Sequence, residues 1–539
     1  MTVREILTLQ FGHYSNFIGT HWWNIQECNF SYDPDNPTEI NHDVLYREGE
    51  SPKREVTYTP RLLTVDLNGT LGYLNERGDL YDSAQQTGEP FPLWESENID
   101  VTKESAPVKP PFIQSLDQSS KNTEPSPFNL EQDVNVWTDF LVPRFHPRTI
   151  NIIKGYKHEC SVQPFDIFNY GQNIWKTTQF NEDFSDRIRA YVEECDLMQG
   201  FHVIMDSTNG FGGLGTSCIE HLRDEYGKSI LAFPVIDSRN AEPSASDLVK
   251  VINIALSWQH TGEYASLFSP LCAGDKGWLQ AGNPRHFNNL NYDLNLKYHS
   301  SALLATALDT LTLRYRQKEY PLSSLSDLCA DLNKMGRKAA ATSLTLPFPM
   351  TAKRDFIDVL DDFEGSMWTS ITPSCEISTD RHMRSLALRG IPEERLKRPL
   401  HDARRQMAKP AYRCSTVHEM MSLYLAYTSH ASATHLTTIK AGLKIKVPYP
   451  AIFNNNVHGN GDIAAWPVGE TVKSVPVMAG LHSGDCISGM FESLHTQASR
   501  VKTIKRFHAF QDSGLEEDEF KQCLHHLLDS KEAYEDHYI

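Results

Sequence analysis

Three short segments of the chain place glycine beside polar side chains at points where an apolar run ends. They are residues 12–16, 66–70 and 207–216. Glycine-rich turns that lead into helices present backbone N–H groups and the positive end of a helix dipole, an arrangement that binds phosphate. The three segments therefore suggest a nucleotide pocket. Tight turns alone would give the same pattern, because a loose cluster of glycines is a weak signal.

The residues that would contact a nucleotide come from all three segments. In a doubly wound sheet, strand-to-helix turns lie together at the carboxyl edge of the strands, where ligands bind. The candidate nucleotide-binding residues are Gly12, His13, Asn16, Asp66, Asn68, Gly210, Gly212, Gly213, Gly215 and Thr216.

Other polar residues predict neither catalysis nor a metal site. Histidines with no cysteine or carboxylate at a metal-ligand spacing are better explained as ordinary buried or exposed side chains. This applies to His430, His435, His525 and His526. The Ser483-Gly484-Asp485 stretch beside His482 lacks the Gly-x-Ser-x-Gly turn of hydrolases. We expect no catalytic residue and no metal ligand.

The order of strands and helices predicts how the three turns are held. Buried strands are expected at 6–10, 62–67, 201–206 and 230–236, and helices at 184–198, 216–226 and 246–258, with a loop at 207–215. Helices that alternate with buried strands predict an α/β fold, with a mostly parallel, Rossmann-type sheet and helices on both faces. Further helices are expected at 301–313 and 327–341, and two helices around a strand after residue 481.

One long segment lacks the apolar residues that a core needs. Residues 83–133 are rich in Ser, Pro, Glu and Gln. A segment of this composition buries too little apolar surface to order itself. We therefore expect a long loop or a disordered insertion there.

The overall charge and the cysteine count exclude some classes of partner and compartment. The 539 residues include 51 Lys and Arg against 69 Asp and Glu, a formal net charge of −18. Duplex nucleic acid and anionic membranes need a positive field, so neither is expected as the main partner. We expect no transmembrane segment and no secretory signal, because no apolar stretch is long enough. Ten sparse cysteines suit a reducing compartment, which predicts the cytosol or the cytosolic face of an organelle.

The chain resembles the tubulins at both ends and in its core. Residues 1–19 contain the tubulin-like Arg-Glu-Ile and Asn-x-Ile-Gly patterns, and 60–70 resembles the tubulin stretch Pro-Arg…Val-Asp-Leu-Glu-Pro-Gly-Thr. Residues 194–201 resemble the approach to the tubulin phosphate loop, and 507–520 resembles the two C-terminal helices. The region from about 349 to 476 has diverged.

This resemblance implies a tubulin-like fold in three regions. Residues 1–330 would form a nucleotide-binding-type domain, interrupted by the insertion at 83–133. A core helix and an intermediate α+β domain would follow at 331–480, and a C-terminal helical region at 481–539.

Four further motifs narrow the resemblance to one family. They lie at 137–140, 146–148, 191–196 and 301–310. By these residues the chain is identified as a member of the Misato family of tubulin-like proteins. The resemblance implies a role in mitochondrial distribution and morphology, and in mitotic spindle assembly and chromosome segregation. It also implies a place in the cytoplasm, at the outer mitochondrial surface and at the spindle, with tubulin and the cytosolic chaperonin and prefoldin machinery as partners.

The nucleotide site departs from the tubulin pattern in its two glycine loops. Tubulin's Gly-Gly-Gly-Thr-Gly-Ser-Gly loop corresponds to 208–215, about one residue shorter, with Phe211 in place of the threonine. A nest of N–H groups needs positions where side chains would not clash. In the first loop His13-Tyr14-Ser15 replaces Gln-Cys-Gly, which would turn the phenol ring toward the phosphates.

Two acidic positions of the tubulin site have also changed. Asn68 replaces a glutamate that helps hold Mg²⁺, and this metal prefers anionic oxygen ligands. Tubulin-type hydrolysis needs an acidic residue from a neighbouring subunit. The nearest candidate is Asp331, although one alignment places Lys334 at that position.

These departures favour a non-catalytic or weakly catalytic protein that acts through its partners. No cofactor is certain, and GTP or GDP is the candidate. The alternative is a slow GTPase that self-assembles into filaments. A weaker option is a mitochondrial adaptor whose acidic insertion docks a fusion factor.

Overall fold

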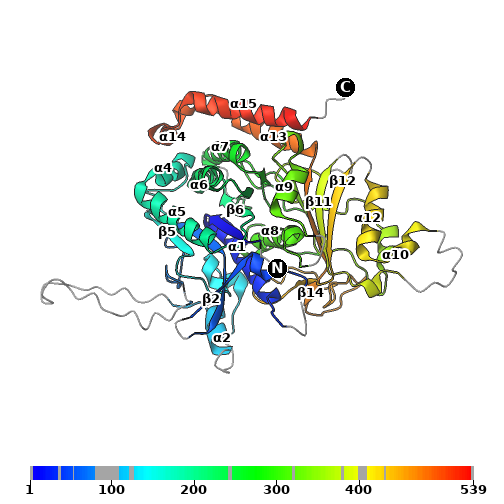
Figure 1. Cartoon of the computed structure of the whole chain (residues 1–539). Helices are drawn as coiled ribbons and strands as arrows, with labels where there is room; N and C mark the ends of the chain where they lie inside the picture. Colours follow the sequence, from blue (N-terminus) through cyan, green and yellow to red (C-terminus); the bar gives the residue numbers. More distant parts are fainter. Residues whose placement is uncertain are drawn as a thin grey trace.

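A parallel six-stranded sheet forms the centre of the computed structural model (Figure 1). The structure describes residues 4–33, 38–51, 54–78, 80, 108–119, 127–240, 244, 246–318, 322–377, 382–397, 409–429 and 432–535. In spatial order the strands are β5 (Ile150–Lys157), β4 (Leu62–Asn68), β1 (Ile6–Phe11), β6 (Gly200–Asp206), β7 (Ser229–Val235) and β8 (Leu267–Phe268). Every residue of β1 and β6 is buried, as expected when helices cover both faces of a parallel sheet.

Two groups of helices cover the faces of this sheet. One face carries α1 (His13–Asn29) and α8 (Lys297–Leu311). The other carries α4 (Phe168–Lys176), α5 (Thr178–Glu193), α6 (Gly210–Tyr226) and α7 (Ser246–Tyr264). The predicted α/β class and the parallel, Rossmann-type sheet are therefore confirmed.

A second, mixed sheet packs on the far side of α8 (Figure 1). In spatial order its strands are β10 (Thr369–Ser370), β9 (Ala341–Thr345), β15 (Val477–Ser483), β11 (Met383–Arg389) and β12 (Ala433–Ile439). A separate apolar cluster joins this sheet to α10 (Phe356–Asp361) and α12 (Val417–Thr428). This arrangement is the expected second α+β part of the fold.

The C-terminal helices form a layer over α7 (Figure 1). They are α13 (Cys486–Ala498), α14 (His508–Asp512) and α15 (Glu517–Tyr534). The remaining named elements are β2 (Tyr46–Glu50), β3 (Val56–Pro60), β13 (Leu443–Lys444), β14 (Ser474–Val475), α2 (Pro111–Ser119), α3 (Leu130–Asp133), α9 (Leu325–Leu332) and the short 3₁₀ turns η1 (His42–Val44), η4 (Trp137–Phe140), η5 (Thr312–Tyr315), η6 (Lys334–Gly336), η7 (Glu393–Arg395), η8 (Pro410–Arg413) and η9 (Ile504–Arg506). Of the helices that the structure describes, none has the length and apolar character needed to cross a membrane.

Three predicted elements differ from the structure. The loop expected at 207–215 ends early, because Asn209 caps a helix that already begins at Gly210. The helix expected at 327–341 spans only α9, where a Ser324–Asp327 capping box fixes its start, and the chain reaches strand β9 at residue 341. Within 486–535, a stretch described without gaps, the structure has helices and no strand, so the strand expected between the last helices was wrong.

Part of the expected insertion is folded. Helix α2 lies within 83–133, and its Phe112 and Ile113 are buried in the main core. The prediction rested on the polar composition of the whole segment and did not weigh this short apolar pair. Helix α2 packs near η4. The prediction of disorder is therefore corrected for this helix and for α3, and residues 83–107 and 120–126 lie outside the described residues.

A buried ion cluster joins the two sheets through α8. The Asp309 carboxylate binds Arg316 Nη2 at 2.9 Å and Arg389 Nη1, on β11, at 2.5 Å. Gln26 of α1 also donates to it, and all three charged side chains are about 1% exposed or less. Burial raises the pKa of Asp309, but the two guanidinium groups outweigh this effect and hold the pKa below its ordinary value. The Asp309 carboxylate thus connects α1, α8 and the second sheet.

Candidate functional site

The three turns singled out in the sequence lie side by side in the structure. Strands β4, β1 and β6 are neighbours in the parallel sheet, so the residues that follow them meet at its carboxyl edge. Asn16 Nδ2 donates to Asp66 across the first two turns at 3.0 Å, and Ser15 donates to Asp206 across the first and third. The sheet therefore brings the predicted segments together.

Asp66 organises one side of this edge. Its Oδ2 accepts hydrogen bonds from Asn16 Nδ2 and from Trp137 Nε1, each at 3.0 Å, and lies 3.4 Å from His13 Nδ1. Burial raises the pKa of Asp66, but the bonds from His13 and Asn16 outweigh it and hold the pKa below the ordinary value. The His13 ring contacts that of His158, with centroids 4.1 Å apart and the ring planes tilted by 36°. The carboxylate is thus held by side chains and has few free acceptor positions for a metal ion.

Asp206 closes the other side of the edge. Its carboxylate accepts the backbone N–H groups of Tyr14 and Ser15, at 3.1 and 2.8 Å, and the Ser15 hydroxyl at 2.7 Å. These N–H groups belong to the first turn of α1, where a phosphate would bind. The carboxylate of Asp206 therefore occupies the anion position of this helix. Burial raises its pKa to about 6, although the Ser15 and Tyr14 bonds act in the opposite direction.

Glycine is required at position 12 because the Asp206 carboxylate lies very close to the start of α1. It caps α1 with φ +110°, a conformation that side chains rarely adopt. A Cβ atom placed there would lie 2.5 Å from the Asp206 carboxyl carbon.

We expect Gly12→Ala to lower the free energy of unfolding by about 1–3 kcal/mol, because it combines backbone strain with a clash against Asp206. Urea denaturation measures the change. Gly489→Ala is the control, since Gly489 lies inside α13 with open space around it. That substitution should raise stability by about 0.5–1 kcal/mol, and equal losses for both variants would contradict the argument.

The backbone N–H groups at the N-terminus of α6 also form hydrogen bonds within the protein. Gly210 N–H donates to the Phe165 carbonyl at 3.1 Å. Phe211 N–H donates to Asn209 Oδ1 at 2.9 Å, and Gly212 N–H donates to the Asn209 carbonyl at 3.1 Å. The first three N–H groups of the helix thus already have acceptors.

The later glycines of the third segment serve helix packing. A Cβ atom on Gly213 would lie 1.9 Å from the Phe168 carbonyl oxygen of α4, and one on Gly215 would lie 2.7 Å from Met205 Sδ of β6. Thr216 Oγ1 donates to the Gly212 carbonyl of its own helix at 2.9 Å. These residues sit inside α6 and let α4 and the sheet approach it closely.

Two family models match the chain between residues 4 and 317. Residues 4–118 match the Misato Segment II tubulin-like domain, and 126–317 match the Tubulin domain. The chain is 36% identical to protein misato of Drosophila melanogaster over 568 aligned residues, which cover 99% of each chain. The chain belongs to the Misato family.

Two further relatives support this placement of the Misato-family chain. Protein misato homolog 1 of Mus musculus is 31% identical over 558 residues, which cover 99% of this chain and 98% of the mouse chain. Protein dml1 of Aspergillus clavatus is 30% identical over 320 residues, 59% of this chain and 61% of its own. The tubulin-like fold predicted from the sequence is therefore confirmed.

In this Misato-family chain, three other residues considered for the nucleotide site are bonded to groups of the protein itself. Asn68 is exposed at the end of β4, and its carbonyl accepts His158 N–H at 2.9 Å. Asp331, the candidate acidic residue of α9, is bound by Arg314 Nη2 at 2.5 Å. The Tyr14 hydroxyl donates to Ser300 Oγ of α8 at 2.9 Å, so the phenol is buried against this helix.

Sequence reasoning missed the residues that fill the anion positions. Asp206 is the last residue of the strand expected at 201–206, and Asn209 lies in the loop expected at 207–215. Asp206 has the same signal that selected Asp66, a carboxylate near the end of a buried strand. Asn209 precedes a helix and has the residue type of a helix cap.

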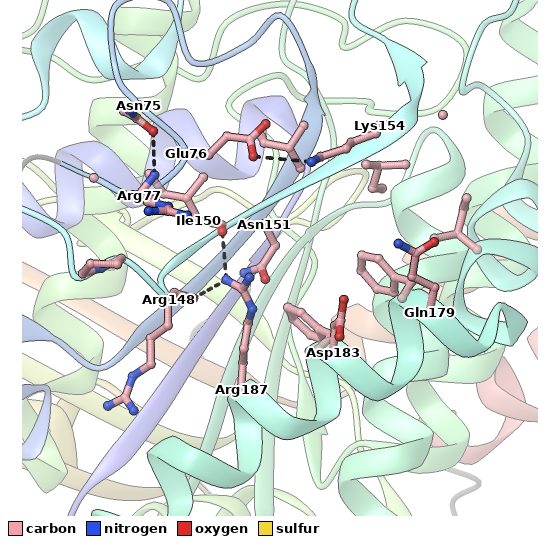
Figure 2. Close-up of a pocket in the computed structure, with 18 of the residues that line it drawn as sticks. Asn75, Glu76, Arg77, Arg148, Ile150, Asn151, Lys154, Gln179, Asp183 and Arg187 are labelled. Atoms are coloured by element: carbon pink, nitrogen blue, oxygen red, sulfur yellow. Dashed lines mark hydrogen bonds and ion pairs between the residues drawn. The ribbon is translucent and has the colours of Figure 1, made fainter. Parts of the chain in front are cut away.

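A groove of about 1140 Å³ lies away from the carboxyl edge of the sheet, beside the outer strand β5. Figure 2 shows Gln179, Asp183 and Arg187 of α5 on one side and the turn that carries Asn75, Glu76 and Arg77 on the other. None of the predicted nucleotide-binding residues is among its described lining residues.

Proposed function

We propose that this Misato-family chain is a non-catalytic or weakly catalytic tubulin-like protein that acts by binding partners. One observation carries the proposal: the chain's own groups fill both helix N-termini at the carboxyl edge of the sheet. Asp206 accepts the first N–H groups of α1, while Asn209 and Phe165 accept those of α6. Preformed N–H groups are what a phosphate needs at such a site.

Two further contacts support weak or absent hydrolysis. A buried carboxylate at position 206 would repel the phosphates of GTP, because like charges in a poorly solvated site interact strongly. Asp331 is engaged by Arg314 within the same chain, which leaves it less able to orient a water in a neighbouring subunit. Asn68 offers no carboxylate to Mg²⁺.

The cellular role that we propose follows from family membership. It comprises mitochondrial distribution and morphology, together with mitotic spindle assembly and chromosome segregation. The proposed partners are tubulin and the cytosolic chaperonin and prefoldin machinery, and the proposed location is the cytoplasm and the outer mitochondrial surface, with the spindle during division. Depletion in cells of the source organism, followed by rescue with Asp331→Ala, tests whether this role needs a hydrolytic carboxylate; full rescue is expected.

Nucleotide content decides between this function and a slow GTPase. Protein purified without added nucleotide is denatured, and the released bases are quantified by liquid chromatography. We expect far less than one GDP or GTP per chain, because the N–H groups already have acceptors. Stoichiometric GDP or GTP would overturn the proposal.

Self-assembly of the chain provides a second test that separates partner binding from a filament-forming GTPase. Sedimentation with and without GTP should give the same distribution if the chain acts through partners. Polymers that form only with GTP would instead establish the filament-forming GTPase.

A further inference from the structure

The outer strand β5 has an open edge. Among the described strands it pairs only with β4, and the Thr149 carbonyl receives Thr64 N–H. Because backbone groups alternate sides along a strand, Ile150 and Ile152 direct theirs away from β4. Arg187 Nη1 donates to the outward Ile150 carbonyl at 3.1 Å, which confirms this direction.

Ile152 carries the unpaired groups of this edge. In the part of the chain that the structure describes, its N–H and C=O have no hydrogen-bond partner. The register then shifts between Leu67 and Asn68: Leu67 pairs with Ile153 and Asn68 with Lys157, so residues 154–156 form an irregularity in β5. An unpaired edge of this kind is a template for another extended chain.

The edge opens into the groove of about 1140 Å³ described above. Figure 2 shows the strand running between α5 and the 75–78 turn, with the Arg187 guanidinium reaching the backbone at one end. Apolar residues that line the groove include Ile150, Ile153, Ile174, Phe180 and Phe184, of which Ile174 and Phe180 are partly exposed and the other three are buried. The groove thus offers main-chain partners beside an apolar surface, which is how strand-adding peptides are recognised.

The charge of the groove is opposite to that of the whole chain. Its described lining residues include four cationic side chains against two carboxylates, namely Arg77, Arg148, Lys154 and Arg187 against Glu76 and Asp183. The chain itself has a net charge of −18. Lys154 is 79% exposed and lies 3.8 Å from Glu76, a pair that contributes little by itself. Arg148 is paired with Glu194, which lies outside the lining, and the other three cationic side chains still outnumber the two carboxylates. An acidic partner complements this local excess of positive charge.

We propose that this groove binds an extended, acidic segment of a partner protein, which adds to the sheet as a strand beside β5. The Ile152 N–H and C=O form the main-chain bonds, and the apolar residues take every second side chain. Carboxylates on the partner face Lys154 and its cationic neighbours. This site is separate from the carboxyl edge of the sheet, so it stands whether or not the chain binds nucleotide.

Fluorescence anisotropy with labelled synthetic peptides tests the proposal on the full chain. The probe is Gly-Glu-Val-Glu-Val-Glu-Val-Glu-Gly. The controls are the same peptide with lysine in place of glutamate, and the acidic peptide N-methylated at alternate residues. We expect saturable binding of the acidic probe alone. Absence of saturable binding, or equal binding of the N-methylated peptide, would overturn strand addition.

A matched pair of variants locates the site. Lys154→Glu should weaken binding of the acidic peptide on the order of tenfold, because it reverses an exposed charge in the groove. Lys157→Glu, on the same strand but outside the described lining, should leave binding within about twofold. Thermal melts of both variants check that each is folded. An equal effect of the two substitutions would place binding elsewhere and refute the assignment.

Discussion

Replacing Asp309 with alanine is expected to lower the free energy of unfolding by about 3–5 kcal/mol. The substitution leaves Arg316 and Arg389 buried together without a counter-charge, and an uncompensated buried charge is strongly destabilising. It also removes the acceptor for Gln26, so α1, α8 and the second sheet lose their common contact. Urea unfolding followed by tryptophan fluorescence measures the change.

Two variants make this result specific. Asp186→Ala breaks an exposed pair with Arg189 on α5 and should change stability by about 0.5 kcal/mol or less. A triple variant that combines Asp309→Leu, Arg316→Met and Arg389→Met replaces the whole cluster with apolar side chains, and it should cost less than Asp309→Ala alone. A triple variant less stable than the single one would show that the charges themselves stabilise the joint.

Replacing Asp206 with serine is expected to create an anion site at the start of α1. The substitution frees the N–H groups of Tyr14 and Ser15 and removes a buried negative charge. At an effective dielectric constant of about 20, two unit charges 4 Å apart repel by about 4 kcal/mol, so the gain in affinity should exceed tenfold. Calorimetric titration with pyrophosphate and GDP measures it, with Asp186→Ala as the control. Unchanged affinity would show that Asp206 does not block the site.

The same variant should change how stability depends on pH. Because folding raises the pKa of Asp206 to about 6, the folded state holds this proton more tightly than the unfolded chain does. The contribution of Asp206 is therefore most favourable below about pH 4 and is lost as the pH rises through about 6. The wild-type free energy of unfolding minus that of Asp206→Ser should fall by about 2 kcal/mol between pH 4 and pH 7. A constant difference would contradict the burial of an ionisable carboxyl.

The parallel sheet and the meeting of three turns were predictable because they depend on patterns along the chain. Buried runs such as 201–206 alternate with helical stripes, and this order implies neighbouring parallel strands with their turns at one edge. The family resemblance supplied the connection to tubulin. Neither kind of reasoning needed the position of a single side chain.

The use of the glycines was not predictable in the same way. Gly213 and Gly215 fit a phosphate nest and a close helix contact equally well, and only the positions of Phe168 and Met205 decide between them. The role of Asp206 depends on which N–H groups lie beside it, which is set by the crossing of β6 and α1. The groove beside β5 was missed for another reason: it is formed by an open strand edge, and an edge has no sequence motif.

The position of β1 in the centre of the sheet has a consequence for synthesis on the ribosome. Its Ile6 pairs with Gly200 of β6, so one side of a strand that is fully buried in the folded protein has no partner until nearly 200 further residues have been made. At about 5–20 residues per second this delay lasts about 10–40 s. A nascent chain that exposes such a strand for that time is prone to aggregate. The order of strands in this sheet thus leaves one side of β1 unpaired during much of translation.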